Sequence, residues 1–194
     1  DDENIDSKDH QDNDDKDKNS NLNKNQNSDQ DSDSADSEET DKQSSEEGIH
    51  TYEVITADMT WNEAYNDCIK RGGYLARINS REEWNAIIAQ IQASNTEACY
   101  FYVSGTRNDG GSSYYWKNEN GELYGEPLNS SAFWGNDLWL ENEPSFQDGD
   151  VTEDAMAILY MKSANRWVLN DVANNPLETE SYLSGKIAYI CEYE

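Results

Sequence analysis

Two segments of the chain carry apolar residues at the spacing of an amphipathic helix. The first segment has apolar side chains at positions i, i+3, i+4 and i+7, namely Trp61, Ala64, Tyr65 and Cys68. The second repeats that spacing with Trp84, Ile87, Ile88 and Ile91. Each begins with a Ser or Thr followed three residues later by Glu, at Thr60…Glu63 and Ser80…Glu83, as in a capping box. With Gly72-Gly73 as a stop signal, we predict helices over residues 60–71 and 81–93.

The rest of the chain after Gly48 has the pattern of short strands. Runs rich in aromatic and β-branched residues alternate with Gly, Asn, Asp and Ser. These runs are Tyr74–Ile78, Tyr100–Gly105, Tyr114–Lys117, Ala155–Met161, Arg166–Leu169 and Ile187–Tyr193. Two early helices followed by many short strands indicate an α+β domain. Residues 118–154 show no sustained period, and so long a loop inside a compact domain is usually functional.

Composition divides the chain near Gly48. Residues 1–48 contain no Trp, Tyr or Phe, and their few aliphatic side chains cannot bury enough apolar area to offset the loss of backbone entropy. We therefore predict that residues 1–48 form a disordered, acidic, low-complexity tail. Residues 49–194 are rich in aromatic side chains and have the length of a single domain.

The chain is strongly acidic, with 41 Asp and Glu against 14 Lys and Arg and a formal net charge of −27. Because phosphate contacts need clustered Lys and Arg, we expect no nucleic-acid ligand. No run of about 18 apolar residues is present, so we expect no membrane-spanning segment. The opening Asp1-Asp2-Glu3-Asn4, without Met, looks like a mature or trimmed form of an exported protein.

Several motifs within residues 48–194 resemble those of C-type lectin domains. The helix-to-helix passage is matched by Thr60-Trp61-Asn62-Glu63-Ala64, Cys68, Gly73-Tyr74-Leu75-Ala76, Ile78 and Ser80-Arg81-Glu82-Glu83. The later strands are matched by Tyr102-Val103-Ser104-Gly105-Thr106, Tyr115-Trp116, Trp139 ahead of Glu143-Pro144, and Tyr189-Ile190-Cys191-Glu192. The resemblance implies a C-type-lectin-like fold, with two helices, short antiparallel sheets and a long ligand loop. It also implies a binding function without catalysis.

From the residues alone, the three cysteines have two possible interpretations. Either two of them form a disulfide and one thiol is left over, or all three are reduced, buried thiols. The resemblance implies a bond between Cys68 and Cys191, which would contribute about 4–5 kcal/mol in the chain-entropy model. The second disulfide of the family is absent, because Ala155 and Asn174 stand at its positions. We expect Cys99 to be a small core residue. This variant looks most like the C-type lectin domains of bacterial surface proteins, which implies a bacterial envelope protein.

Several classes of chemistry are disfavoured by the residues present. Residues 51–194 contain no His, which argues against Ser-His-Asp and Cys-His nucleophilic sites and against the usual zinc sites. No Gly-rich phosphate loop or dinucleotide fingerprint follows a predicted strand. A glycoside-cleaving enzyme stays open on the acidic residues alone, and it would need two carboxyls facing each other across a groove. We expect the protein not to be an enzyme.

The domain is rich in oxygen ligands, of which Ca²⁺ takes roughly six to eight. By resemblance, the sugar-linked Ca²⁺ site of C-type lectins uses a Glu-Pro-Asn loop with a cis proline, a Glu before a core strand, and an Asn-Asp pair on the next strand. The implied metal ligands here are Glu143, Glu153, Asn170 and Asp171. Ser145 replaces the Asn of the loop, and a hydroxyl is a poorer Ca²⁺ ligand than an amide oxygen. In the family, two vicinal sugar hydroxyls complete the shell.

Other residues near this loop have less specific signals. Phe146 and Trp134 are candidates for stacking on a sugar ring, whereas we expect Trp139 and Trp167 to be core residues. Three further acids could serve an auxiliary cation or simply be solvated, namely Asp148, Asp150 and Asp154. Without the resemblance, the Asn170-Asp171 pair could equally make a turn.

These observations predict a Ca²⁺-dependent carbohydrate-binding module that is extracellular or displayed on the cell surface, with a glycan or glycoprotein as partner. The acidic tail would be a spacer to an envelope anchor. The alternative is a metal-independent adhesin or interaction module that binds protein on the same fold. The two readings differ in whether the four implied ligands converge on one point.

Overall fold

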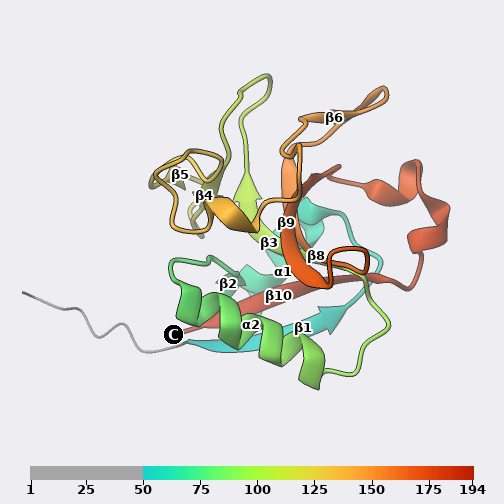
Figure 1. The fold of residues 1–194 in the computed structure, drawn as a ribbon. Coiled ribbons are helices and arrows are strands. Elements are labelled where there is room, and N and C mark those ends of the chain that lie inside the picture. The colour runs from blue at the N-terminus through green and yellow to red at the C-terminus, as the bar shows by residue number, and fades with distance from the viewer. Residues whose placement is uncertain (1–49) are drawn as a thin grey trace, which may run out of the picture. The chain divides into compact units, whose positions relative to one another are not determined.

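The structure is a computed structural model that describes residues 50–194 (Figure 1). The tail predicted over residues 1–48 lies outside the described residues. Two α-helices occur in the described part, α1 (Trp61–Lys70) and α2 (Arg81–Ala93), together with short strands that are mostly antiparallel. The predicted α+β architecture is therefore confirmed.

One mixed sheet joins the two ends of the domain. Its first strand, β1 (Thr51–Thr56), pairs antiparallel along its whole length with the last, β10 (Ile187–Tyr193). β10 also pairs antiparallel with the short β2 (Tyr74–Leu75) and parallel with β3 (Tyr100–Thr106). In Figure 1, β1 and β10 run side by side next to α2.

The same sheet continues from β3 into the part of the domain that carries the predicted ligands. β3 pairs antiparallel with β8 (Ala155–Met161), which pairs with β9 (Arg166–Val172). A second branch runs from β3 through β4 (Tyr115–Lys117) to β5 (Leu123–Tyr124). Because β9 extends to Val172, the Asn170-Asp171 pair lies within a strand and not in a turn.

The two helices begin where the capping signals predicted. At α1 the capping box is complete, because Thr60 accepts from the N–H of Glu63 at 3.2 Å and Glu63 accepts from the N–H of Thr60 at 2.9 Å. At α2 only half of the box forms, because the carboxylate of Glu83 accepts from the N–H of Asn79 at 2.6 Å instead of that of Ser80. Helix α1 ends one residue before the predicted boundary, and Gly72 follows with a left-handed φ of 85°.

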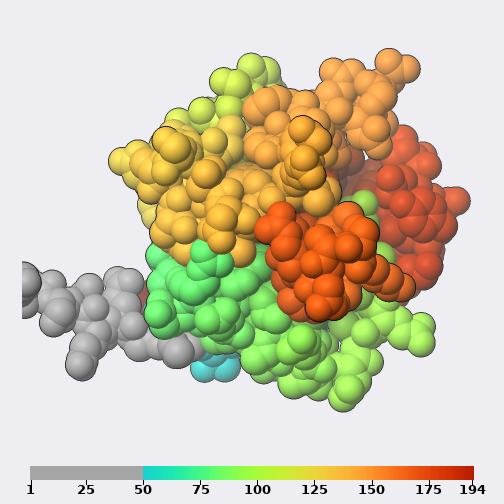
Figure 2. Space-filling view, in the orientation of Figure 1, coloured from blue at the N-terminus to red at the C-terminus, as the bar shows by residue number. Residues whose placement is uncertain are grey.

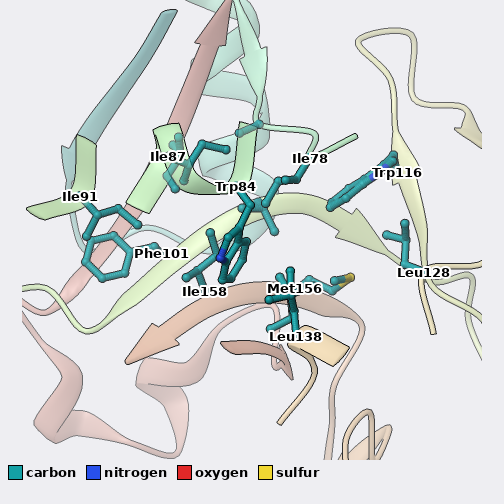
Figure 3. Close-up of a cluster of buried hydrophobic side chains, with 14 of the residues drawn as sticks. Ile78, Trp84, Ile87, Ile91, Phe101, Trp116, Leu128, Leu138, Met156 and Ile158 are labelled. Carbon is teal, nitrogen blue, oxygen red and sulfur yellow. The ribbon is translucent and has the colours of Figure 1, made fainter. Parts of the chain in front are cut away.

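The helices and the sheet enclose two apolar clusters. One cluster packs α2 against β3 and β8 (Figure 3) and includes Trp84, Ile87, Ile91, Phe101, Met156 and Ile158. The long segment predicted as a loop contributes buried anchors to it, namely Leu128, Phe133, Leu138 and Trp139. The other cluster packs α1 against β10 and β8. Buried apolar anchors at these positions tie the long segment to the sheet, which fixes the base of the candidate site.

The cysteines are arranged as the resemblance implied, with one exception. Cys68 of α1 and Cys191 of β10 form a disulfide, with their Cα atoms 5.4 Å apart. Cys99 is exposed, so the prediction of a core residue is wrong. The reason is its position before β3, where the first buried side chain is that of Phe101.

Asn174 ties the loop after β9 to the start of α1. Its carbonyl oxygen accepts from the N–H of Trp61 at 2.8 Å. Its side-chain oxygen accepts from the N–H of Asn62 at 3.0 Å. These two hydrogen bonds satisfy N–H groups in the first turn of α1, which have no partner within the helix.

Candidate functional site

Asp171 is the central residue of the candidate site. It lies on β9 opposite Met156 of β8, and it is fully buried. Its carboxylate accepts hydrogen bonds from the N–H of Phe146 at 2.7 Å, the N–H of Ser145 at 3.3 Å and the hydroxyl of Tyr114 at 3.0 Å. A carboxylate has about four lone-pair positions, so these donors stabilise the buried charge and leave room for one further contact.

The loop that contacts Asp171 has an unusual backbone. The Glu143–Pro144 peptide bond is cis, as predicted. Phe146 has a φ of 67°, which is uncommon for an aromatic residue, and its N–H donates to Asp171. The carbonyl oxygen of Phe146 accepts from the N–H of Glu153 at 3.1 Å. Phe146 is therefore bonded through its backbone to both Asp171 and Glu153.

Three of the predicted ligands converge. One carboxylate oxygen from each of Glu143, Glu153 and Asp171 lies within 4.8 Å of the others. Oε2 of Glu143 and Oδ1 of Asn170 are buried, and neither has a hydrogen-bond partner among residues 50–194. Buried oxygen atoms normally have a partner, and a cation satisfies such atoms as well as a donor does. The donor set therefore fits a hard divalent cation.

The amide of Asn170 is held in place by its neighbour. Its nitrogen donates to the carbonyl oxygen of Asp171 at 2.7 Å, which fixes the opposite side of the amide as the oxygen. Asn170 is half-buried and lies opposite Ala157 of β8. Pairing with β8 thus fixes the positions of both Asn170 and Asp171 within a strand. The Asn-Asp sequence alone is equally typical of a turn.

The carboxylates of the cluster destabilise one another's charge. Burial raises the pKa of Glu153 to about 7, and the negative charge of Asp171 adds to this increase. Burial likewise raises the pKa of Glu143, and Asp171 adds to it, whereas hydrogen bonding from Ser145 opposes it. Like charges in a poorly solvated site favour either a proton or a cation between them. The cluster is therefore electrostatically suited to a divalent cation.

Arg107, which no sequence signal indicated, holds this loop through hydrogen bonds to backbone carbonyl groups. Its guanidinium donates to the carbonyl oxygens of Glu153 at 2.9 Å, Phe146 at 2.9 Å and Gly111 at 2.6 Å. It also pairs with the carboxylate of Asp154 at 3.0 Å, and its side chain is only 7% exposed. A planar guanidinium with several fixed donors can bind several carbonyl groups at once. Arg107 therefore positions both chain segments that supply Glu143 and Glu153.

Tyr114 was predicted only as a strand residue, and it also supports the site. Its ring is fully buried, and its hydroxyl lies 2.5 Å from the carbonyl oxygen of Glu153 and 3.0 Å from the carboxylate of Asp171. Burial and the nearby charge of Asp171 raise the pKa of this phenol, so it keeps its proton. The hydroxyl has one proton and therefore donates to one of these two oxygens at a time.

The two aromatic candidates have different positions. Phe146 is half-buried, and its ring stacks on Tyr114 with centroids 6.0 Å apart and also faces the guanidinium of Arg107. Trp134 donates from its indole nitrogen to the carbonyl oxygen of Ile78 at 3.2 Å and contacts Arg81 at the start of α2. Phe146 thus belongs to the ligand loop, whereas the contacts of Trp134 are with the start of α2 and not with the three carboxylates.

The surface next to the carboxylates is acidic and open. Ser145 is exposed, and its hydroxyl donates to the carboxylate of Glu153 at 3.2 Å. Asp148 and Asp150 are exposed on a hairpin of β6 (Gln147–Asp148) and β7 (Val151–Thr152). This hairpin borders a cleft of about 280 Å³ that Glu153 also lines. Figure 2 shows residues 118–154, coloured yellow to orange, on one face of the molecule, with the yellow part beside the green of α2.

Comparison with known proteins identifies the family. The family model described as the lectin C-type domain matches residues 57–174, which is more than half of the chain. The chain belongs to the C-type lectin domain family. The C-type lectin domain family 4 member A of Homo sapiens is 28% identical over 121 residues, which cover 62% of this chain and 44% of that protein. This C-type lectin domain therefore matches less than half the length of its human relative.

Solved structures of low sequence identity share the fold. The C-type lectin domain of murine dendritic cell inhibitory receptor 2, in complex with N-glycan, has a TM-score of 0.50 at 18% identity and covers 75% of this chain and 91% of its own. The C-type lectin CEL-I from Cucumaria echinata has a TM-score of 0.52 at 15% identity, with the same coverage. Human lithostathine has a TM-score of 0.52 at 15% identity and covers 76% of this chain and 85% of its own.

The comparisons confirm a C-type-lectin-like fold. Within residues 50–194, no helix of this C-type lectin domain combines the length and the apolar composition that crossing a bilayer requires. The family is broadly one of carbohydrate-binding domains, and many of its members bind Ca²⁺ and lie outside the cell.

Proposed function

We propose that this C-type lectin domain binds a glycan or glycoprotein outside the cell through a Ca²⁺ ion held by Glu143, Glu153, Asn170 and Asp171. The observation that carries the proposal is the convergence of three carboxylates within 4.8 Å beside two buried oxygens that lack a partner among the described residues. Those two oxygens, on Glu143 and Asn170, both belong to the set that the family resemblance implied.

The chemistry of the set matches Ca²⁺ better than other common cations. All its side-chain donors are carboxylate or amide oxygens, which hard cations prefer, and Ca²⁺ accepts roughly six to eight of them in flexible geometry. When bound, the ion supplies coordination positions for two vicinal sugar hydroxyls. The carboxylate of Glu143 would accept hydrogen bonds from those hydroxyls, and the amide nitrogen of Asn170 would donate to them. Ser145, at the rim, has a short side chain that reaches less far toward the ligand than Asn does.

The arrangement favours binding over hydrolysis of a glycan. A glycosidase places two carboxyls about 5 Å or more apart on either side of the scissile bond. Here Asp171 is fully buried, so it has no face for a sugar ring, and the carboxylates are grouped around one point. We therefore propose a module without catalytic activity.

The same proposal includes a location for the protein outside the cell or at its surface. Members of the family are typically extracellular or exposed at the cell surface. We propose the same for this chain, with residues 1–48 as a hydrophilic spacer to an envelope anchor. The single-disulfide variant of the motifs supports a bacterial source, although the relatives named above include human and murine proteins.

One observation favours the second candidate, a module that binds protein without metal. The carboxylate of Asp171 already accepts hydrogen bonds from the N–H groups of Ser145 and Phe146, and the hydroxyl of Tyr114 lies 3.0 Å from it. These donors stabilise the negative charge of Asp171 and hold the loop against it. The loop conformation is therefore explained without a cation. In that case the open acidic surface beside the cluster would contact a partner protein.

Thermal melting with excess Ca²⁺ and then with a chelator separates the two candidates. A cation that binds only the folded state stabilises it by mass action, by about 2.7 kcal/mol at a hundredfold excess over the dissociation constant. We expect a higher melting temperature with Ca²⁺, and glycan-array binding that the chelator removes. An unchanged melting temperature, with ligand binding that persists in chelator, would instead favour the metal-independent module.

A further inference from the structure

An open, acidic cleft of about 540 Å³ runs along α1 and shares no residue with the proposed Ca²⁺ cluster. It is lined by one stripe of the helix and the turn before it, namely Asp58, Met59, Glu63, Asn66, Asp67 and Lys70. From residue 63 to residue 70 the helix rises about 10 Å, because each residue adds about 1.5 Å. The cleft is therefore long enough for about three residues of an extended chain.

Two carboxylates of this cleft are held in place through one oxygen each. Oε2 of Glu63 accepts from the N–H of Thr60 at 2.9 Å, and Oδ2 of Asp67 accepts from the guanidinium of Arg71 at 2.5 Å. These hydrogen bonds lower the pKa of both carboxyl groups, so both keep their negative charge at neutral pH. Oε1 of Glu63 and Oδ1 of Asp67 accept no hydrogen bond from any group within residues 50–194. Each is free to accept one from a ligand.

Two tyrosines from neighbouring strands extend beneath α1. Tyr102 of β3 and Tyr189 of β10 are opposite each other in the parallel pairing, and both pack in the apolar cluster under the helix. The hydroxyl of Tyr189 reaches the cleft, where it donates to the carboxylate of Asp67 at 2.5 Å. The hydroxyl of Tyr102 is also buried, but it has no hydrogen-bond partner among residues 50–194. Of the two phenols, only that of Tyr102 is thus left with an unused polar group.

The unpaired hydroxyl of Tyr102 lies under the cleft. Burial raises the pKa of this phenol, and the negative charges of Asp58 and Glu63, which both line the cleft, raise it further. Met59 is half-buried, lines the same cleft and packs against the apolar cluster that contains Tyr102. Methionine side chains are flexible, so Met59 can move aside and open the hydroxyl to a ligand. A ligand that hydrogen-bonds this hydroxyl removes the cost of leaving it unpaired.

We propose that this cleft binds an arginine-rich segment of a partner protein, whose guanidinium groups contact the free oxygens of Glu63 and Asp67 and the hydroxyl oxygen of Tyr102. A guanidinium is planar and has five N–H donors, so it can join several separated acceptors. A single metal ion fits less well, because within residues 50–194 no three ligand groups of this cleft come within 4.8 Å of one another.

The charge of the protein favours the same partner. A formal net charge of −27 attracts a basic protein over a distance, and the cleft then supplies the specific contacts. Lys70 is exposed at the opposite end of the cleft from Asp58, and its positive charge opposes a basic ligand there. The guanidinium groups therefore bind nearer to the start of α1, above the hydroxyl of Tyr102.

Nuclear magnetic resonance on the full chain tests the proposal with an acetylated, amidated triarginine peptide. The titration is made at about 0.15 M salt, which screens exposed charges that are far apart, and with a chelator that keeps the proposed Ca²⁺ site empty. We expect saturable shifts of the amide signals of residues 58–70, and none with a triglutamine peptide. Shifts of the acidic residues 1–48 as large as those of residues 58–70 would show attraction to net charge alone and would overturn the proposal.

Tyr102→Phe separates a binding role of the hydroxyl from a structural one. The change removes an unpaired polar group, so the melting temperature of the free protein should stay the same or rise, whereas affinity for triarginine should fall about three- to tenfold. Tyr52→Phe is the matched control, because it removes another buried hydroxyl without a partner in the described part of the chain. Equal affinities in Tyr102→Phe and Tyr52→Phe would overturn the proposal.

Two further variants test the charge of the cleft and its independence from the Ca²⁺ cluster. Lys70→Gln removes the opposing positive charge and should raise the affinity for triarginine about twofold. Asp171→Asn removes a proposed Ca²⁺ ligand and should bind triarginine as the unmodified chain does, so the two sites can fail separately. A lower affinity in Lys70→Gln would contradict binding of a basic segment along α1.

Discussion

The N–H of Phe146 donates to the carboxylate of Asp171 at 2.7 Å, which joins the ligand loop to strand β9. The residue that fixes the loop is thus itself one of the proposed ligands. Loop conformation and ligand geometry are therefore coupled, and changes in the supports of the loop should alter cation binding even where no ligand is removed.

Arg107 offers the clearest test of this coupling. Arg107→Lys keeps the positive charge but loses the planar arrangement of donors that binds the carbonyl groups of Phe146, Glu153 and Gly111. We expect the free energy of unfolding to fall by about 1–3 kcal/mol and Ca²⁺ affinity to fall about tenfold or more. Chemical denaturation and calorimetry measure the two effects. Arg71→Lys, at the exposed end of α1, is the control, and equal results for both variants would contradict a positioning role.

The raised pKa of Glu153, about 7 against an ordinary 4.5, predicts opposite pH trends for stability and for binding. Between about pH 4.5 and 7 the folded, cation-free domain holds a proton that the unfolded chain has released, so its stability should fall as pH rises through this window. Ca²⁺ affinity should rise over the same window, because the cation competes with that proton.

Melting curves and calorimetry across this pH range measure the two trends. Glu153→Gln removes the titrating group and should reduce both slopes. Ca²⁺ affinity that stays constant from about pH 5 to pH 7 would show that the cluster does not hold the ion.

Ser145 should limit affinity and sugar preference. Ser145→Asn places an amide oxygen at the rim of the cluster, as in the Glu-Pro-Asn loop of the family. We expect tighter Ca²⁺ binding and stronger binding of sugars with vicinal equatorial hydroxyls. Ser145→Ala is the matched control, because it removes the hydroxyl that donates to Glu153 without adding a ligand. If Ser145→Asn and Ser145→Ala bind glycan equally, the serine is not part of the ligand site.

The disulfide should account for a large part of the stability of the domain. Cys68 and Cys191 are 123 positions apart, and closing so long a loop contributes about 4–5 kcal/mol in the chain-entropy model. We expect a comparable loss in the paired Cys68→Ala, Cys191→Ala variant, measured by denaturation. Mass mapping of a non-reduced digest should find Cys99 unpaired, and any peptide that joins Cys99 to another cysteine would contradict this pairing.

Local signals predicted the helices well, whereas strand boundaries depended on distant partners. The capping residues at Thr60 and Ser80 act within one turn, so the sequence around them is sufficient. Strand β1 was missed because its partner, β10, lies at the other end of the domain. The predicted strand that ended at Leu169 continues to Val172, because pairing with β8 overrides the turn preference of Asn170-Asp171.

The candidate site could be predicted only in part, and by a different route. The positions of Glu143, Glu153 and Asp171 came from the family resemblance, since no periodicity relates residues so far apart. The role of Arg107 could not be predicted, because bonds from a guanidinium to backbone carbonyls leave no pattern in the partner side chains. Contacts that depend on tertiary structure become visible only once the chain is folded.

Calorimetric Ca²⁺ titration of Glu153→Gln and Asp171→Asn tests the central claim most directly. Each change keeps a side-chain oxygen and removes one negative charge from a site that must offset a divalent cation. Asp171→Asn also turns an amide toward the N–H groups of Ser145 and Phe146, so we expect it to lower the melting temperature, which makes Glu153→Gln the cleaner variant.

Glu141→Gln is the matched control, because Glu141 is exposed in the same loop two positions before Glu143. The account predicts that Ca²⁺ and glycan binding are lost in Glu153→Gln and in Asp171→Asn, and are unchanged in Glu141→Gln. Equal Ca²⁺ affinity in Glu153→Gln and Glu141→Gln would contradict it, because the cluster would then be ordinary acidic surface and the metal-independent module would take its place.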